Sequence, residues 1–331
     1  MMSPPHDIAP IPTGLHPRKA GPGRVNQEPK RLVSMTMTAD DILTHPAFAA
    51  CARDQAQALL TVHKASPRTA SPFASQQRWL MVQVALAAYF RNEARRPGAG
   101  LLAERFVDLV VDHDLASRNT AAAFVNEMLK YGILRRIEAS EGKRNRPVEP
   151  SPATLAILSR WLAVHLATLD GLDHGARSAA WRAQPSLLGM VQPLISDGLL
   201  ASPAVREPNG TVALFTSIND GGIVMDRLVV GCQEVSVGLE RIPTDVMTIS
   251  ALSRGLNVSR TLLGRKLAVA TSKGSLGWAG PFGRSVLWMS LGFWREYHAA
   301  QAVKLAIIDA AFAAGSAQCA RDQLLKAAAS A

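Results

Sequence analysis

The segment Ser117–Arg136 constrains the fold of this chain more than any other stretch. Its apolar residues follow the i, i+1, i+4, i+5 spacing of a helix with one buried stripe, at Phe124, Val125, Met128 and Leu129. Ser117 is suited to cap the start of that helix, and Gly132 is suited to supply the left-handed residue that ends it. The pattern therefore predicts a recognition helix followed by an extended segment.

A wing, meaning a short β-hairpin with a basic tip, is predicted directly after this helix. Ile133 and Leu134 begin an extended run, and Glu141–Pro147 supplies a polar, basic tip before a second run. Pro152 then opens a closing helix predicted over residues 153–169, with Gly171 ending it. Helix, turn, helix and hairpin in this order are typical of a winged helix-turn-helix.

Composition favours a mainly helical protein with room for two domains. The chain has 331 residues, of which 48% are hydrophobic and only 5% aromatic, a balance that favours helices over a β-sandwich or barrel. Apolar spacing predicts one long helix over 39–64, a second over 75–93 and a third over 102–112. The third lies directly before the predicted recognition helix, where a helix-turn-helix needs its first helix.

The second half of the chain repeats the order of the first at an offset of 142 residues. The offset places Phe73–Ser75 on Phe215–Ser217, Ser117–Arg118 on Ser259–Arg260, Gly132 on Gly274, and Leu134 on Leu276. The second half also has its own helix-turn-helix pattern over Ile249–Leu267, with a turn at Gly255 and a short wing over Trp278–Arg284. Because a single offset aligns four separate segments, the sequence predicts two copies of one domain.

The predicted fold class is mainly α with small β-wings, arranged as tandem winged helix-turn-helix domains that form an intrachain pseudo-dimer. The apolar helices over 39–64, 153–169 and 286–313 are expected to join the halves. A tail that holds seven prolines and little periodic apolar signal is expected to be disordered and basic. The predicted divisions are this tail at 1–38, a first winged-helix domain at 39–170, a linker at 171–181, a second winged-helix domain at 182–315, and a C-terminal helix or tail at 316–331.

The positive charge of the chain is concentrated in the two predicted DNA-reading regions. The formal net charge is +10, and residues 116–146 carry a net +4 while residues 254–284 carry a net +6 with no acidic residue. A solvated basic surface without a partner would spread the charge more evenly. The distribution therefore predicts an anionic partner, with double-stranded DNA favoured by the motifs.

The first half resembles a MarR-type winged helix. The resemblance is carried by Thr120, Phe124-Val125, Met128-Leu129, Gly132-Ile133-Leu134 and Arg136, then by the basic wing and the long closing helix. It implies a regulator whose recognition helix enters the major groove, whose wing arginine reaches the minor groove, and whose terminal helices pair two domains. It also implies a small-molecule pocket, which Trp79, Tyr89, Trp161, Trp181, Trp288 and Trp294 are candidates to line. Members of that family carry one such domain and dimerise, whereas the duplication here puts both halves in one chain.

The candidate DNA contacts fall into three groups by position. Early recognition-helix residues suit base edges: Arg118, Asn119, Arg260, Thr261 and Arg265. Wing residues suit phosphate or the minor groove: Lys143, Arg144, Arg146 and Arg284. Lys130, Arg135 and Lys273 are suited to contact backbone phosphates. Further candidate contacts at or in the two recognition helices are Ser117, Thr120, Asn126, Ser259 and Lys266. For each charged residue, the alternative is a solvated helix charge.

The sequence gives little support for an enzyme, a metal site or a membrane-spanning segment. The histidines form no i, i+4 ligand pair, and the serines show no nucleophile-elbow spacing, so no catalytic residue, metal or cofactor is predicted. The three cysteines are far apart and are expected to be reduced core residues. The longest apolar run noted, Trp79–Phe90, is too short to span a bilayer. The expected location is therefore cytoplasmic and nucleoid-associated.

The sequence thus predicts sequence-specific binding of double-stranded DNA, by a monomer that acts as a pseudo-dimer and regulates transcription. A small-molecule effector is a possible partner. Alternatives within DNA binding are a replication-initiator-type protein and a nucleoid protein. A different class of alternative is a winged-helix scaffold for protein interactions, in which the basic charge meets an acidic partner.

Overall fold

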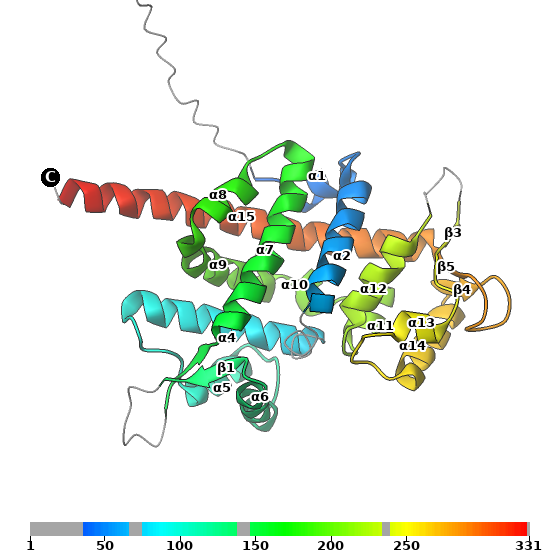
Figure 1. Cartoon of the computed structure of the whole chain (residues 1–331), viewed down its shortest axis with the longest axis horizontal. Coiled ribbons are helices and arrows are strands. Elements are labelled where there is room, and N and C mark those ends of the chain that lie inside the picture. The colour runs from blue at the N-terminus through cyan, green and yellow to red at the C-terminus, as the bar shows by residue number, and fades with distance from the viewer. Residues whose placement is uncertain (1–35, 66–74, 138–145, 234–238, 330–331) are drawn as a thin grey trace, which may run out of the picture. The chain divides into compact units, whose positions relative to one another are not determined.

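A computed structural model describes residues 36–65, 75–137, 146–233 and 239–329 of the chain. These residues belong to one compact unit and are mainly helical, with two small antiparallel sheets (Figure 1). The expected disordered tail at 1–38 lies almost wholly outside the described residues, as do the predicted wing contacts Lys143 and Arg144.

The first half of the unit contains helices and a hairpin around the segment for which the sequence predicts a recognition helix. In chain order the elements are α1 (Ala39–Thr44), α2 (Phe48–Ala65), α4 (Gln76–Arg95), α5 (Ala103–Asp112), α6 (Arg118–Lys130), β1 (Leu134–Arg136), β2 (Val148–Pro150) and α7 (Pro152–Asp173). Leu134 lies opposite Pro150 in the β1–β2 ladder, and Leu101 bridges Val148 on the other side of β2.

The second half returns to a similar order after a group of connecting helices. The connecting elements are α8 (Arg177–Ala183), η2 (Pro185–Leu187), α9 (Leu188–Ala201) and α10 (Pro203–Arg206). They are followed by α11 (Gly210–Thr216), α12 (Gly221–Gly231), β3 (Arg241–Pro243), α13 (Ile249–Ser253), α14 (Arg260–Ser272), β4 (Leu276–Trp278), β5 (Leu287–Ser290) and α15 (Leu291–Ala329). The strand order in the second sheet is β3-β5-β4, and both pairings are antiparallel.

The offset of 142 residues relates α6 to α14 and β1 to β4 without a change in length. Gly132 and Gly274 both adopt left-handed φ angles, of 67° and 72°, immediately before these strands. The same backbone hydrogen bond closes both helices, from Ile133 N to Met128 O at 2.9 Å and from Ser275 N to Ala270 O at 3.0 Å. Of the matched segments Phe73–Ser75 and Phe215–Ser217, Phe73 and Ala74 lie outside the described residues. Ser75 directly precedes α4, whereas Ser217 directly follows α11 and lies four residues before Gly221, where α12 begins.

The single helix predicted over 39–64 is wrong, because the chain forms two helices there. Thr38 begins α1 with a reciprocal capping box to Asp41, as its side chain type allows. The break follows from Pro46, whose ring disfavours helical backbone at the preceding residue. His45 is accordingly extended, with ψ at 127°, and α2 starts two residues after the proline.

Two predicted helix ends are also wrong. The closing helix α7 does not end at Gly171 but runs to Asp173, and His174 follows in the left-handed conformation. Gly171 instead serves close packing, since a Cβ atom there would lie 3.1 Å from the sulfur of Cys51 on α2. The last helix, expected over 286–313, begins only at Leu291 because residues 287–290 form β5, and it continues without a break through 316 to Ala329.

Two clusters of buried side chains form the core, and α15 contributes to both. Phe293 and Tyr297 pack into a cluster with α12, α14 and the second sheet, whereas Leu305, Ile308 and Phe312 pack into the cluster that contains α4, α6, α7 and α9. The close contact of α9 with α15 depends on glycine, because a Cβ atom at Gly198 would lie 2.6 Å from Ile307 Cγ2. Since α9 packs in the first cluster, the core divides later in the chain than the predicted boundary at 182.

The helices expected to join the halves do make contacts across them. Helix α2 contacts both α7 and α12, and α15 contacts α1, α7, α9 and α11. The predicted linker at 171–181 is not extended, because it contains the end of α7 and much of α8.

A buried guanidinium ties α7, α8 and α15 together. Arg177 is only 7% exposed, and its Nη2 lies 2.7 Å from Asp173 Oδ2 while its Nε lies 2.7 Å from Asp309 Oδ1. The hydrogen bonds from Arg177 lower the pKa of Asp173. Asp309 also accepts a hydrogen bond from the backbone N–H of Met37 at 2.8 Å, which anchors the chain before α1.

Replacing Arg177 with Met should lower the free energy of unfolding by about 3 kcal/mol or more, because it leaves the buried Asp309 carboxylate without its counter-ion. Urea unfolding followed by circular dichroism measures the change. Arg182→Met is the matched control, since Arg182 lies on the same helix and is exposed; we expect a change within about 0.5 kcal/mol. Equal stability of the two variants would contradict the structural role of Arg177.

Candidate nucleic-acid interface

The first helix pair, α5 and α6, is joined by a tight turn that local residues determine. Asp114 adopts a left-handed φ of 53°, and the N–H of Leu115 donates to the carbonyl of Val110 at 3.1 Å. Ser117 then caps α6, because its hydroxyl accepts a hydrogen bond from the N–H of Thr120 at 3.3 Å. The cap predicted from the sequence is thus confirmed, and it fixes where the exposed first turn of α6 begins.

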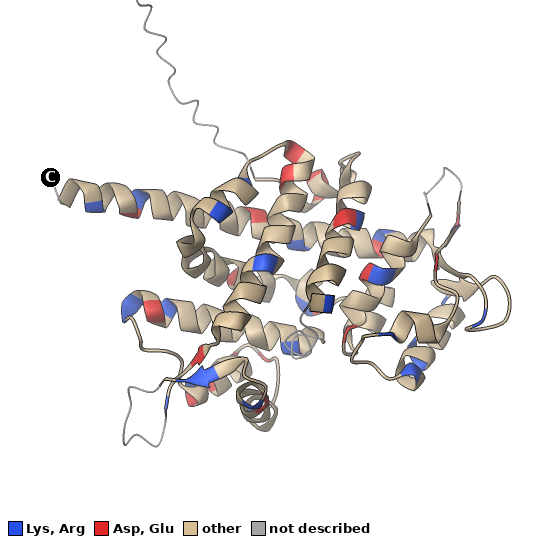
Figure 2. Cartoon of the chain, in the orientation of Figure 1, with Lys and Arg blue, Asp and Glu red and all other residues tan. Residues whose placement is uncertain are grey.

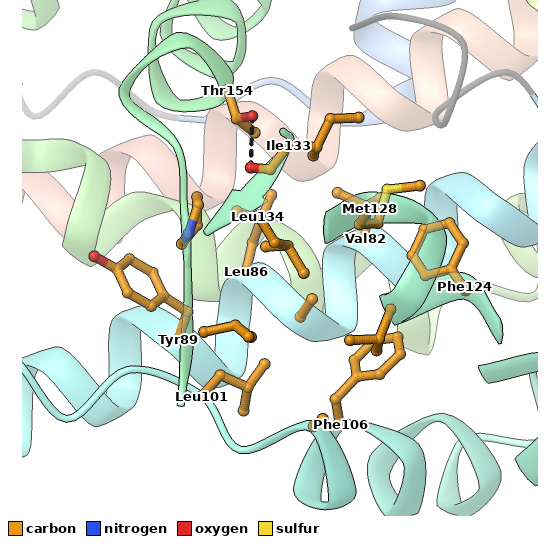
Figure 3. A pocket seen from close by; sticks show the side chains of 15 residues that line it. Val82, Leu86, Tyr89, Leu101, Phe106, Phe124, Met128, Ile133, Leu134 and Thr154 are labelled. Carbon is orange, nitrogen blue, oxygen red and sulfur yellow. Dashed lines mark hydrogen bonds between the residues drawn. The ribbon is translucent and has the colours of Figure 1, made fainter. Parts of the chain in front are cut away.

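Apolar side chains of neighbouring elements pack against the buried face of α6. Side chains of α4, α5, α6 and the hairpin surround a cavity of about 40 Å³, into which Val82, Leu86, Phe106, Phe124 and Met128 point (Figure 3). The rings of Phe106 and Phe124 stack at a centroid distance of 6.1 Å. The hydroxyl of Thr154 on α7 donates to the carbonyl of Ile133 at 2.9 Å, the bond dashed in Figure 3. Helix α6 is therefore held through its buried stripe, which leaves the opposite face free.

The exposed face of α6 carries the residues that the sequence predicts for base contact. Arg118, Asn119, Thr120, Asn126 and Lys130 are all exposed. Arg118 Nη1 lies 2.8 Å from Asp108 Oδ1 on α5, but the two side chains are 63% and 44% exposed. An ion pair at that exposure contributes little to stability. The Arg118 guanidinium can therefore leave Asp108 and donate to another acceptor.

The second helix pair, α13 and α14, has the same local construction. Gly255 supplies the left-handed residue of the turn, with φ at 78°, and the hydroxyl of Ser259 accepts from the N–H of Leu262 at 3.1 Å. Among the predicted contact residues, Arg260, Thr261 and Arg265 are exposed. Lys266 differs from the expectation of a free contact, because it is half-buried and its ammonium donates to the Ser217 hydroxyl at 3.0 Å.

The two hairpins place further basic residues beside these helices. Arg135 on β1 pairs with Glu149 on β2 at 2.8 Å, and Arg146 is exposed just before β2. In the second hairpin, Arg284 is exposed in the turn between β4 and β5, and Lys273 is exposed at the end of α14. Figure 2 shows basic segments on β1 and on α14.

Sequence reasoning left some basic residues of these elements out of the candidate set. Arg136 is exposed on β1 and Arg254 is exposed directly after α13. Arg241 on β3 is exposed and stacks over the Trp288 ring at 4.7 Å. The first two lie within the basic stretches that the charge count identifies, so that count could have found them; Arg241 required the β3–β5 pairing, which is not a local property of the sequence.

A larger cavity lies between the two core clusters. Its volume is about 320 Å³, and α2, α4, α7, α12 and α15 contribute to its lining. Of the aromatic residues expected to line a pocket, Trp79 and Trp161 do so and Tyr89 lines the smaller cavity. The other three have different contacts: Trp181 is buried in the first core cluster, Trp288 packs under Arg241, and Trp294 stacks on His298.

Charged side chains in this cavity were not anticipated from the sequence. Burial raises the pKa of Asp226 to about 6, against the opposing effects of Lys304 and of the hydrogen bond from the Tyr297 hydroxyl at 2.7 Å. Burial also lowers the pKa of Lys304 to about 8. Asp220 accepts a hydrogen bond from the N–H of Asn257, in the turn before α14, at 2.5 Å. Asp220 and Asp226 belong to the start and the interior of α12, whereas Tyr297 and Lys304 lie on α15, and no spacing pattern signals that these two distant segments meet.

Comparison of the chain with protein-family models, curated proteins and solved structures finds no match. Among the described residues, no group of three His, Cys, Asp or Glu side chains is placed to hold a metal ion. Two described helices, α7 and α15, are long and apolar enough to cross a membrane by length and composition alone, and both contribute side chains to the core.

Asp226→Asn should stabilise the protein increasingly as the pH rises. The pKa of Asp226 in the folded chain, about 6, is above its ordinary value of 3.8, so the folded state holds the proton more tightly and loses stability as the pH rises from about 4 to about 6. Asparagine cannot ionise and still accepts from Tyr297. The stability of the variant relative to the parent should therefore grow by about 2 kcal/mol between pH 4.5 and pH 8.

Urea unfolding of both proteins across this pH range measures the difference. Asp112→Asn provides the control at an exposed carboxylate, and its difference from the parent should stay nearly constant. A flat profile for Asp226→Asn as well would mean that Asp226 ionises normally in the folded chain.

Proposed function

We propose that the chain is a sequence-specific double-stranded DNA-binding protein of the winged helix-turn-helix type, resembling MarR regulators, that controls transcription. In this proposal, α4–β2 and α11–β5 are two winged-helix units, α6 and α14 are their recognition helices, and the pair acts as a pseudo-dimer within one chain. The observation that carries the proposal is that two serine-capped helices of equal length each expose basic and polar side chains and each lead into a hairpin.

The exposed first turns of α6 and α14 have suitable chemistry for reading base edges. Arg118 and Arg260 occupy equivalent positions directly after the caps, and an arginine there can donate two hydrogen bonds to guanine. Asn119 can pair with adenine in the same way. The free N–H groups of each first turn add affinity for a phosphate oxygen.

The basic residues beside these helices supply the part of binding that does not depend on sequence. Arg146, Lys273 and Arg284 are exposed at the hairpins or at the end of α14, where they can contact phosphates or the minor groove. The two basic stretches hold a net +4 and +6, which equals the excess of the whole chain. Binding through such contacts releases counterions, so affinity should fall steeply with salt.

The two recognition helices differ, so the preferred site is expected to be asymmetric. The caps and the first arginine are shared, but Asn119 in α6 corresponds to Thr261 in α14, and Ala123 corresponds to Arg265. If the halves mimic a dimer, two unequal half-sites should be spaced about 10–10.5 base pairs apart. Selection of a true palindrome would contradict this assignment.

A protein-interaction scaffold is the second candidate, and one observation favours it. Leu262 and Val269 on α14 are 38% and 41% exposed, and Phe282 in the second hairpin is 47% exposed. Apolar side chains on an outward helix face suit a protein partner better than a base edge. Under this alternative, α6 alone or neither helix would read DNA.

Selection from a random duplex library, repeated across a salt series, tests the proposal. We expect an enriched two-part motif, and we expect Arg118→Ala and Arg260→Ala each to weaken binding to it by about 1–3 kcal/mol, roughly 5- to 150-fold, because each removes a bidentate base contact. Arg182→Ala is the control for loss of one exposed positive charge away from both helices, and it should leave the motif and its affinity nearly unchanged.

The outcomes separate the candidates. Loss of selectivity in Arg118→Ala with no effect of Arg260→Ala would leave one DNA-reading helix and support a protein-docking role for α14. Salt-sensitive binding without an enriched motif would indicate a nucleoid-type protein, and no binding at any salt concentration would refute DNA binding.

A further inference from the structure

The exposed face of α14 is more apolar than the equivalent face of α6. The offset of 142 residues aligns the two helices position by position, so α6 provides a comparison within the same chain. Three exposed positions of α14 are apolar where α6 is polar: Leu262, Ala268 and Val269 stand in place of Thr120, Asn126 and Glu127. A helix that contacts only DNA gains little from such residues, because base edges offer few apolar groups besides the thymine methyl.

An aromatic residue of the second hairpin extends this apolar surface. Phe282, in the turn between β4 and β5, is exposed and contacts the ring of Trp278 at a centroid distance of 5.5 Å. A Cβ atom at Gly283 would lie 3.1 Å from Ile249 Cδ1, and one at Gly264 on α14 would lie 3.6 Å from the same atom. The hairpin turn and the first half of α14 therefore approach each other through Ile249, which brings Phe282 close to the apolar residues of α14.

Positive charge surrounds the apolar residues, without any negative charge in the same stretch. Residues 254–284 carry a net +6 and contain no acidic residue. The exposed basic residues there include Arg254, Arg265, Lys273 and Arg284. Within the part of the chain that the structure describes, none of these four forms an ion pair. A surface that is both apolar and uniformly positive is complementary to a segment that carries apolar and acidic side chains.

We propose that α14 and the second hairpin bind an amphipathic helix of a partner protein, with apolar side chains on one face and Asp or Glu residues beside them. Leu262 and Val269 are seven residues apart, which is about 10.5 Å along a helix. They therefore match apolar residues spaced by about two turns in a partner helix that lies along α14. The small side chain of Ala268 lets the partner backbone approach, and Arg265 and Lys273 pair with its carboxylates.

The partner helix covers the face of α14 that is also proposed to read DNA. On the assumption that the DNA binding proposed above holds, the partner and the second half-site exclude each other, because both contact the first turns of α14. Helix α6 stays free to bind DNA, since its exposed face is polar and lies in the other winged-helix unit. The docking itself does not depend on DNA binding.

The first arm of the test uses the full chain without DNA. A display library of helical peptides, with positions varied among Leu, Ala, Ser, Glu and Lys, is selected for binding. We expect enrichment of peptides that combine a leucine stripe with flanking glutamates, and fluorescence anisotropy of the best one gives its Kd. Leu262→Thr and Val269→Thr should each weaken binding about fivefold or more, because each removes apolar area from the contact.

Matched variants at exposed apolar positions outside the surface are the controls. Leu102→Thr and Val111→Thr, at the start and near the end of α5, change residues of similar exposure and should leave peptide binding unchanged. The docking surface is refuted if no peptide is enriched, if the enriched peptides are basic or uncharged, or if they bind Leu262→Thr and Val269→Thr as tightly as the parent.

The second arm measures the Kd for the selected duplex with and without the best peptide at saturation. We expect the peptide to weaken DNA binding about fivefold or more, as loss of one base-reading helix requires. With the peptide bound, Arg260→Ala should have no further effect, whereas Arg118→Ala should still weaken binding. A peptide of the same composition with its leucines spread around the helix is the control.

The two arms fail separately. An unchanged Kd for the duplex with the peptide bound would refute the shared use of α14 and leave the docking surface intact. A chain that binds the peptide but no DNA would refute only the proposed function.

Discussion

The arrangement of this protein depends on one constraint: helix α15, which is 39 residues long, must pack into two hydrophobic clusters. The first turns of α15 bury Phe293 and Tyr297 in the second core cluster, and later turns bury Leu305, Ile308 and Phe312 in the first. A helix is rigid over such a length, so its register fixes both clusters at once. Gly198 lets α9 approach α15 closely, and Arg177 fixes α8 and the end of α7 to Asp309 on α15. The two core clusters are therefore joined through one helix, α15, that contributes side chains to both.

Local features of the sequence predict the two helix pairs well, because a cap, a turn glycine and a buried stripe are properties of neighbouring residues. Ser117 and Ser259 cap their helices and Gly132 and Gly274 end them as expected. The break at Pro46 is also a local property of the sequence, but the apolar spacing across 39–64 predicts a continuous helix there. The packing of α9 on α4 and the division of the core after α10 could not be predicted, since both depend on contacts between segments that are far apart in sequence.

The same distinction applies to the sites. Exposed basic residues on α6 and α14 follow from spacing and charge, whereas the cavity requires seven helices from both halves to meet. The family resemblance, and not the residue pattern, leads to the expectation of a pocket, and two of the six aromatic candidates, Trp79 and Trp161, line this one. The sequence gives no sign that Asp226 on α12 and Lys304 on α15 line one cavity, because the two helices meet only after folding. Their opposite pKa shifts, Asp226 upward and Lys304 downward, share one cause, which is that burial penalises the charged form of each.

The two helix pairs are supported by different kinds of interaction, and this difference bears on how the interior can influence each of them. Helix α6 packs on apolar side chains that include Phe106 and Phe124. Close packing of this kind is sensitive to changes in the shape and volume of the side chains. The turn before α14 is held by the buried carboxylate of Asp220, close to His63. A charge placed in the cavity acts over a longer range in this low-dielectric surrounding than a change in packing does. A change in packing is therefore expected to shift α6, whereas a change in charge is expected to shift α14. The exposed faces of the two helices need not respond equally to one change in the interior.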